Sequence, residues 1–346
     1  MAAVSAMINP VTADRPNEKK RVYIFSALTK NSTLSFEQRK LVDGGKSTTR
    51  HDGSSPVPLS QKIKNPSSLV TINYDDTVFV YGTCLFIPPP KTGEATTPEA
   101  TSVLSLFSPV HEHVALDQAQ NKVPVPNGLI AGCTDNEKLW IFYQSISKTA
   151  DGTTNVIKRS EVSQSVGSHS TLAAEDVMDK TWLAAFHDTT RQWVVFQTIK
   201  KRLAVWNVNQ QKQTDVNSDG NLFKPGGTIA ATFVKADKID KTKVPSFKPN
   251  DKTLGRAFVY YLYNVNGNDV LHRAYADLES KQASPDFSTP VMVGDDAQNV
   301  QAQAQMSVVV DVEQQCNWIY TLMEGNSDTV SAIRDQWSTG KEKSDE

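Results

Sequence analysis

Short apolar runs rich in β-branched and aromatic side chains recur in pairs along this chain, and a polar stretch separates the two runs of each pair. The clearest pair lies at 182–197, with the sequence WLAAFHDTTRQWVVFQ. There the polar residues 187–192 separate the apolar runs 182–186 and 193–196. Two such runs around a polar turn predict an antiparallel β-hairpin.

The same two-run unit occurs six times within the 346 residues. The middle residues of the second runs, which follow one another at steps of 54 to 65 residues, are Tyr23, Phe79, Trp140, Val194, Val259 and Ile319. Six β units at a near-constant spacing are typical of a closed repeat. We therefore predict an all-β fold, a six-bladed β-propeller, in which residues 1–346 form a single domain with blades centred near 23, 79, 140, 194, 259 and 319.

Each unit carries a third apolar or mixed run and usually a weaker fourth. The second run is the most apolar, as expected for a strand in the middle of a blade that is packed on both faces. No stretch longer than about ten residues has a helical period. Three segments rich in Pro, Gly, Ser or Lys, at 43–68, 87–100 and 235–254, are expected to lie outside the blades and to be the most mobile parts.

Charge and composition exclude several classes of partner. The 36 Lys and Arg residues nearly balance the 38 Asp and Glu residues, and the net charge is −2, so no bulk field attracts nucleic acid or an anionic membrane. No apolar run approaches the ~20 residues that cross a bilayer, and the first ten residues lack the basic and apolar regions of a secretory signal. The three cysteines, Cys84, Cys133 and Cys316, cannot all pair, so we expect buried reduced thiols and a cytoplasmic protein.

Few residues suggest catalysis or a metal. His111 and His113 would share one face of a strand, but no third ligand is placed by spacing. Residues 215–220 match the first half of a calcium loop, whose twelfth position is here Gly226 rather than Glu, so a turn is expected. The predicted inner strands are almost free of acids, which argues against hydrolysis by paired carboxylates. We therefore expect no enzymatic activity, no cofactor and no metal.

The repeat resembles that of the fungal fucose-specific lectins, which are six-bladed propellers. A blade of that family contains, approximately, an "LAAxxW" strand, an "RVYxQ" strand and an "IRE" strand with a following Trp. The first element is matched here at 183–185, the second at 21–23, and the third at 333–335 with Trp337 two residues on. The likeness spans almost the whole chain as a pattern, although no single motif is diagnostic.

The resemblance implies that an Arg of strand two and an acid of strand three bind sugar hydroxyls while an aromatic ring packs on the sugar. The six positions matching that Arg hold Arg21, Thr77, Lys138, Gln192, Ala257 and Asn317. The strand-three acid is matched by Asp335, and by Glu37 only after a one-residue shift, which turns a side chain to the opposite face. We therefore expect at most one or two sugar sites, contributed by Arg21, Glu37, Asp335 and Trp337.

Three of these residues also have a structural interpretation. Arg21 would solvate a strand edge, Glu37 would form a surface ion pair with Arg39 or Lys40, and Trp337 would pack beneath the last blade. Two functions stay open: a lectin whose partners are fucosylated glycans, and a scaffold, storage or protein-interaction propeller that has lost sugar binding. An Arg, acid and aromatic set in one open pocket would favour the first, and pockets filled by the chain's own side chains would favour the second. Homo-oligomerisation is left open.

Overall fold

The computed structural model describes residues 3–27, 34–41, 47–52, 63–64, 67–88, 99–109, 112–115, 122–135, 137–149, 152–163, 166–216, 224–265, 268–294, 300–325 and 329–338. These residues form β-strands and a few short 3₁₀ turns, grouped into six antiparallel sheets. The prediction of an all-β, six-bladed β-propeller is confirmed.

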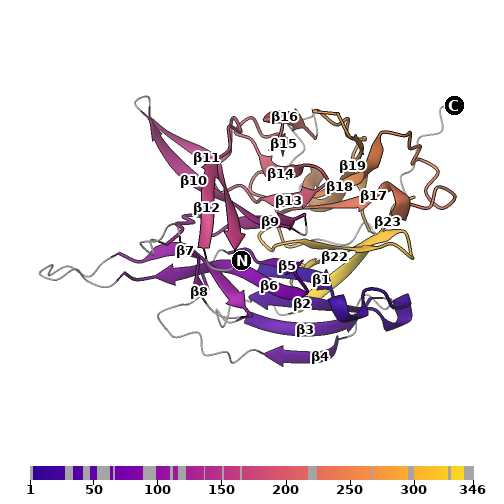
Figure 1. Ribbon diagram of the computed structural model, residues 1–346, viewed down its shortest axis with the longest axis horizontal. Helices are drawn as coiled ribbons and strands as arrows, with labels where there is room; N and C mark the ends of the chain where they lie inside the picture. The colour runs from indigo at the N-terminus through magenta and orange to yellow at the C-terminus, as the bar shows by residue number, and fades with distance from the viewer. Residues whose placement is uncertain are drawn as a thin grey trace, which may run out of the picture.

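The six sheets, or blades, follow one another in chain order (Figure 1). Blade 1 contains β1 (Ala3–Ile8), β2 (Arg21–Ala27), β3 (Leu34–Lys40) and β4 (Ser47–Asp52). Blade 2 contains β5 (Val70–Tyr74), β6 (Thr77–Phe86), β7 (Thr101–Ser108) and β8 (Glu112–His113). Blade 3 contains β9 (Ile130–Thr134), β10 (Leu139–Thr149), β11 (Gly152–Ser163) and β12 (Val166–Thr171).

The second half of the chain repeats this plan. Blade 4 contains β13 (Ala184–His187), β14 (Gln192–Gln197), β15 (Leu203–Asn207) and β16 (Lys212–Asp215). Blade 5 contains β17 (Ile229–Lys235), β18 (Thr253–Val265), β19 (Asn268–Glu279) and β20 (Val291–Met292). The described strands of blade 6 are β21 (Ser307–Asp311), β22 (Cys316–Leu322) and β23 (Val330–Gln336). The six residues expected at the blade centres lie in the second strands, β2, β6, β10, β14, β18 and β22.

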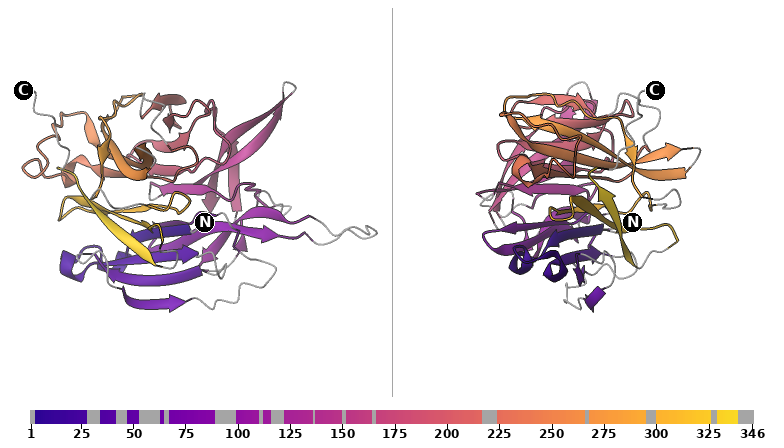
Figure 2. Two further views of the ribbon diagram at one scale, coloured as in Figure 1. Left: turned by 180° about the vertical axis from the view of Figure 1, so that it is seen from behind. Right: turned by 90° about the vertical axis from the view of Figure 1, so that its right-hand side faces the viewer.

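The first strand of each blade lies nearest the axis, and these inner strands close a ring. β1 contacts β5, β5 contacts β9, β9 contacts β13, β13 contacts β17, β17 contacts β21, and β21 returns to β1. Longer second and third strands carry some blades beyond the ring, as the hairpin of β10 and β11 shows in Figure 2. The inner strands can approach closely because they carry small residues. A Cβ added at Gly132 would lie 2.6 Å from a methyl carbon of Val70 in the neighbouring blade.

The hydrophobic core lies between the blades. Six clusters of buried side chains each join the facing sides of two neighbouring blades, so every blade buries both of its faces. In blade 1, for example, Val22 and Ile24 pack toward blade 6, while Phe25 packs toward blade 2. This two-sided burial explains why the second strands are the most apolar runs of the sequence.

Two expectations about the connecting segments need correction. The segment 43–68 contains strand β4, although its sequence is polar, because an outer strand pairs through its backbone. The segment 235–254 is packed against blade 5: it contains the 3₁₀ turn η4 (Ala236–Lys238), and Ile239, Val244 and Phe247 are buried in the cluster between blades 5 and 6. Most of the segment 87–100 lies outside the described residues.

No helix among the described residues is long and apolar enough to cross a membrane.

Because neighbouring blades share every core cluster, we expect the chain to unfold as one domain. Differential scanning calorimetry should show one transition whose calorimetric and van't Hoff enthalpies agree. Two separated transitions would contradict the single-domain prediction.

The cysteines give a second test of the core. All three cysteines are reduced and buried, and burial raises the pKa of the Cys84 thiol to about 12 and that of Cys316 to about 11, and also raises that of Cys133. We therefore expect no reaction with a thiol reagent such as DTNB at pH 8 while the protein is folded, and three reactive thiols after unfolding in guanidinium chloride. Rapid labelling of the folded protein would contradict this packing.

Candidate functional site

The structure places Arg21 and Glu37 on opposite faces of blade 1. Arg21 is paired with Lys40, whereas Glu37 is paired with Ile24, which belongs to the cluster between blades 1 and 6. Because side chains alternate along a strand, Arg21 lies on the other face, toward blade 2, together with Phe25. The one-residue shift noted in the sequence therefore separates these two residues.

Glu37 forms an ion pair with Arg39, as the structural interpretation of the sequence expected, but the pair is buried rather than on the surface. The Glu37 Oε2 atom accepts hydrogen bonds from Arg39 Nη2 at 2.7 Å and from Arg39 Nε at 2.9 Å. The two side chains are 7% and 3% exposed. The pair is enclosed where blade 1 faces blade 6, so the Glu37 carboxylate is already bound by the protein itself.

Asp335 lies between blades 5 and 6, where it forms a buried ion pair with Arg273 of β19. Arg273 Nη1 donates to both carboxylate oxygens at 2.8 Å, and the Tyr260 hydroxyl donates to Asp335 Oδ2 at 2.6 Å. Asn317 donates in turn to the Tyr260 hydroxyl oxygen at 2.7 Å. Burial raises the pKa of the Asp335 carboxyl, and the bonds from Arg273 and Tyr260 act against that rise. Burial, followed by the Asp335 charge, raises the pKa of Tyr260 well above its usual value, which keeps this hydroxyl a donor.

Trp337 is buried in the same seam, and its ring stacks on Phe258 with the ring centroids 5.7 Å apart. It thus has the packing role that the structural interpretation expected, but between blades 5 and 6 rather than beneath the last blade. The four residues predicted from the sequence consequently lie in three seams of the propeller: Arg21 between blades 1 and 2, Glu37 between blades 6 and 1, and Asp335 with Trp337 between blades 5 and 6. The structure brings only the last two together. Their role in sugar binding stays a prediction.

A different Arg, acid and aromatic set lies on blade 5. Arg256 of β18 is paired directly with Asp277 of β19, so both side chains share one face of the sheet. Arg256 Nε and Nη2 donate to the two Asp277 oxygens at 2.6 and 3.0 Å. The guanidinium also bonds to the Ser246 hydroxyl and carbonyl oxygens, and it lies 4.0 Å from the centroid of the Tyr275 ring. The Arg256 side chain is buried, whereas that of Asp277 is 33% exposed.

A cavity of about 440 Å³ opens on the exposed side of this set. Residues of β19 and of the loop that follows it line the cavity: Tyr275, Ala276, Asp277, Glu279, Gln282, Asp286, Phe287 and Ser288. The loop is held in place at both ends. Arg191 of blade 4 donates to the carbonyl oxygens of Glu279 and Gln282, and the backbone of Ser288 bonds to that of Tyr275 at 2.8 Å. We call this the blade-5 cavity.

The Arg256–Asp277 pair lies one residue away from the position that the lectin motif predicted. That motif placed Ala257 at the strand-two position, whereas the structure pairs Arg256 with Asp277 and continues β19 to Glu279. A signal was present. The dipeptide Asn266-Gly267 is typical of a two-residue hairpin turn, and counting outward from it, with 265 opposite 268, pairs 256 with 277, as the structure does. Counting from the hairpin turn was therefore more reliable than matching a strand motif.

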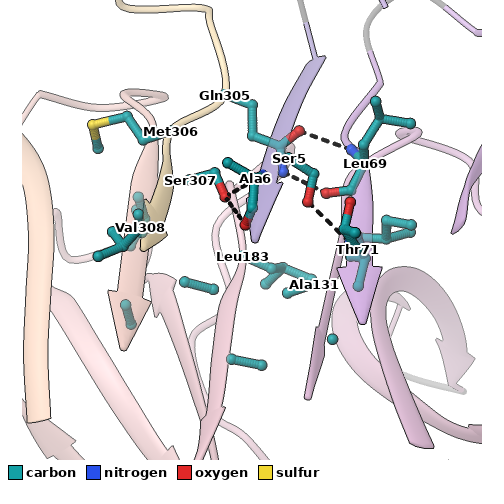
Figure 3. A pocket seen from close by; sticks show the side chains of 18 residues that line it. Ser5, Ala6, Leu69, Thr71, Ala131, Leu183, Gln305, Met306, Ser307 and Val308 are labelled. Atoms are coloured by element: carbon teal, nitrogen blue, oxygen red, sulfur yellow. Dashed lines mark hydrogen bonds between the residues drawn. The ribbon is translucent and has the colours of Figure 1, made fainter. Parts of the chain in front are cut away.

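The axis of the propeller contains a second, smaller cavity of about 200 Å³, lined by the inner strands of all six blades. Figure 3 shows hydroxyl groups that link neighbouring inner strands around it: the Ala6 amide donates to Ser307 Oγ, and the Thr71 amide donates to Ser5 Oγ, both at 2.9 Å. None of its lining residues is charged. The hydroxyl groups around this axial cavity therefore join the blades, and its small volume and uncharged lining do not suit a charged or large ligand.

No candidate metal centre was found within the described part of the chain, where no three His, Cys, Asp or Glu residues are grouped to hold an ion. Of the two motifs weighed in the sequence, His111 and residues 217–220 lie outside the described residues.

Comparison with solved structures finds the same architecture in two lectins. The fungal lectin of Aleuria aurantia, a six-bladed β-propeller described with a fucose recognition mode, matches with a TM-score of 0.52 and 11% identity over 99% of this chain and 97% of that chain. The SapL1 lectin, solved with α-methyl fucoside, matches with a TM-score of 0.54 and 10% identity over 96% of this chain and 91% of that chain. No protein-family model and no curated protein sequence matches the chain. At this identity the likeness is one of fold.

The Asp335 cluster yields a stability prediction. Asp335→Asn keeps the size of the side chain but leaves the buried Arg273 guanidinium without a counter-charge, so the free energy of unfolding should fall by about 3–5 kcal/mol. Denaturant unfolding measures this change, and Glu324→Gln, which removes one exposed carboxylate of blade 6, is the matched control. Unchanged stability combined with lost fucose binding would instead support the role of Asp335 as a sugar ligand.

Proposed function

We propose that this protein is a carbohydrate-binding propeller that performs no covalent chemistry and that its sugar site is the blade-5 cavity. The observation that carries the proposal is the lining of this cavity, which combines two aromatic rings with carboxylate, amide and hydroxyl groups. Sugars present both an apolar face of C–H groups and a ring of hydroxyls, so a site of this composition matches both surfaces.

The arrangement of Asp277 suits a hydrogen-bond acceptor for sugar hydroxyls. Its carboxylate is fixed by two bonds from the buried Arg256, and the side chain stays partly exposed to the cavity. A carboxylate has about four lone-pair sites, so acceptor capacity is left after these two bonds. Bonds to a charged acceptor contribute ~1.5–3 kcal/mol each, and a pre-oriented carboxylate avoids part of the ordering cost of binding.

Fucose is the first sugar to test. The two lectins of similar fold are described with fucose or α-methyl fucoside, and this is the support for proposing the same sugar here. Affinity for a monosaccharide in such a shallow site is expected between millimolar and tens of micromolar, or ~4–6 kcal/mol. Arg21, on the face of blade 1 toward blade 2, stays a second proposed location for a sugar.

The alternative function is a scaffold, storage or protein-interaction propeller. The seams between blades favour it, because the Arg39–Glu37 and Arg273–Asp335 pairs are satisfied by the chain's own side chains. Such filled seams leave no charged groups there for a sugar. This alternative and the lectin proposal differ in whether any glycan binds.

A glycan array followed by calorimetry on each hit tests the proposal. We expect Phe287→Ala to weaken binding at least tenfold, because it removes a ring of the cavity, while the control Glu324→Gln leaves binding unchanged; Arg21→Ala tests the second location. Melting temperatures of all variants separate lost binding from lost folding. If only Arg21→Ala abolished binding, the site would lie on blade 1 and the blade-5 placement would be wrong. An absence of binding to fucose and to every arrayed glycan would overturn the lectin proposal and leave the scaffold.

A further inference from the structure

The blade-5 cavity carries an excess of negative charge. Three of its lining residues are acids, Asp277, Glu279 and Asp286, and none is Lys, Arg or His. Of the three, Asp277 is paired with Arg256. The Glu279 carboxylate accepts a hydrogen bond from the uncharged Asn250 amide at 2.7 Å, and no ion pair to Glu279 or Asp286 occurs in the described part of the chain. The cavity therefore retains two carboxylates without a counter-charge.

The neighbouring cations do not neutralise these two carboxylates. The guanidinium of Arg191 is paired with the buried Asp188, with Nη2 and Oδ2 2.7 Å apart. Its bond to Glu279 goes to the backbone carbonyl oxygen and not to the carboxylate. Lys252 and Lys281 are exposed on the segments that border the cavity, but neither lines it. A ligand entering the cavity thus meets a negative potential.

The aromatic lining points to the same ligand charge independently of the acids. The Tyr275 ring is already contacted by two cations of the chain itself, since the guanidinium carbons of Arg256 and Arg273 lie 4.0 and 5.9 Å from its centroid, so Phe287 is the ring of the cavity on which attraction of a cationic ligand depends. Phe287 is partly buried against the cluster between blades 4 and 5 and lines the cavity. Aromatic faces attract ammonium groups. The Phe287 ring, together with the carboxylates of Glu279 and Asp286, therefore favours a ligand of the blade-5 cavity that is both partly apolar and positively charged.

We propose that the blade-5 cavity selects glycans that carry a free amino group, such as glucosamine units, over neutral or N-acetylated sugars. This inference rests on the proposed function, since it names the class of sugar that the same cavity takes. The ammonium group of the ligand lies between Glu279 and Asp286, and the C–H face of the sugar packs on Phe287. Asp277, held by Arg256, accepts a hydroxyl. Two charge-assisted bonds to the ammonium group supply the selectivity.

The test compares two ligands that differ only in N-acetylation: a tetramer of glucosamine and the tetramer of N-acetylglucosamine, titrated calorimetrically into the full chain at pH 6.5. We expect the glucosamine tetramer to bind at least tenfold more tightly, and its affinity to fall as the salt concentration rises from 50 to about 300 mM, where exposed charges are screened. The double variant Glu279→Gln, Asp286→Asn should lose the tenfold preference, measured as the ratio of its affinities for the two tetramers. Glutamine at 279 can still accept the Asn250 bond, so the fold is preserved.

The control is the double variant Glu324→Gln, Glu137→Gln. It also removes two carboxylates, one from blade 6 and one from blade 3, but leaves the cavity intact, so it should keep the preference. Equal affinities for the two tetramers, or a preference that survives in the Glu279, Asp286 variant, would overturn the inference. If the neutral tetramer bound and Phe287→Ala abolished that binding, the proposed function would stand without amine selection. A lysine-containing peptide that competed equally well with the glucosamine tetramer would show selection of ammonium groups in general and would overturn the assignment to glycans.

Discussion

The structure depends on the closure of the ring between its first and last blades. The described strands of blade 1 all come from the N-terminal part of the chain and those of blade 6 from the C-terminal part, so side chains must join them. Gln305 makes the central connection: its Oε1 atom accepts from the Val4 amide at 3.1 Å and from the Leu69 amide at 2.8 Å, and its Nε2 atom donates to the Leu69 carbonyl at 2.7 Å. One amide group thereby ties blade 6 to blades 1 and 2. At the outer side, Asn17 donates to Asp311 at 3.0 Å across the same junction.

Closure also decides where charge can be used for recognition. When six sheets pack face to face, any ionisable group on a blade face is removed from water and needs a partner within the protein. The pairs Arg39–Glu37 and Arg273–Asp335 satisfy that need in two seams. In blade 5, by contrast, Asp277 stays partly exposed at the blade-5 cavity and so remains available to a ligand. The candidate site therefore lies on one blade rather than in every seam.

In blade 5 the candidate site lies at the C-terminal end of β19, beyond the two residues, His272 and Arg273, with which β20 pairs. The strands β18 and β19 are among the longest of the fold, and the segment 235–254 packs beside them through Ile239, Val244 and Phe247. The Ser246 hydroxyl of that segment helps to bury Arg256, which in turn fixes Asp277 at the cavity. A propeller fold is shared with proteins of several functions, so it is this local construction, rather than the fold, that supports carbohydrate binding.

The sequence by itself determined the strand pattern, the six-fold repetition and the position of each second strand, because a strand buried on both faces must be apolar throughout and repeats must recur at the same spacing. It did not determine which groups meet. An alternating pattern identifies the two faces of a strand, but the pairing register decides which residues of two strands share a face. For that reason Glu37 lies on the opposite face from Arg21, and Arg256 rather than Ala257 is paired with the strand-three acid, Asp277. The polar composition of β4 also gave no sign of a strand, because its pairing uses backbone groups common to all residues. In the same way, the lysine-rich composition of the segment 235–254 gave no sign that three of its apolar side chains are buried. Both depend on surfaces supplied by distant parts of the chain, so only the tertiary structure could decide them.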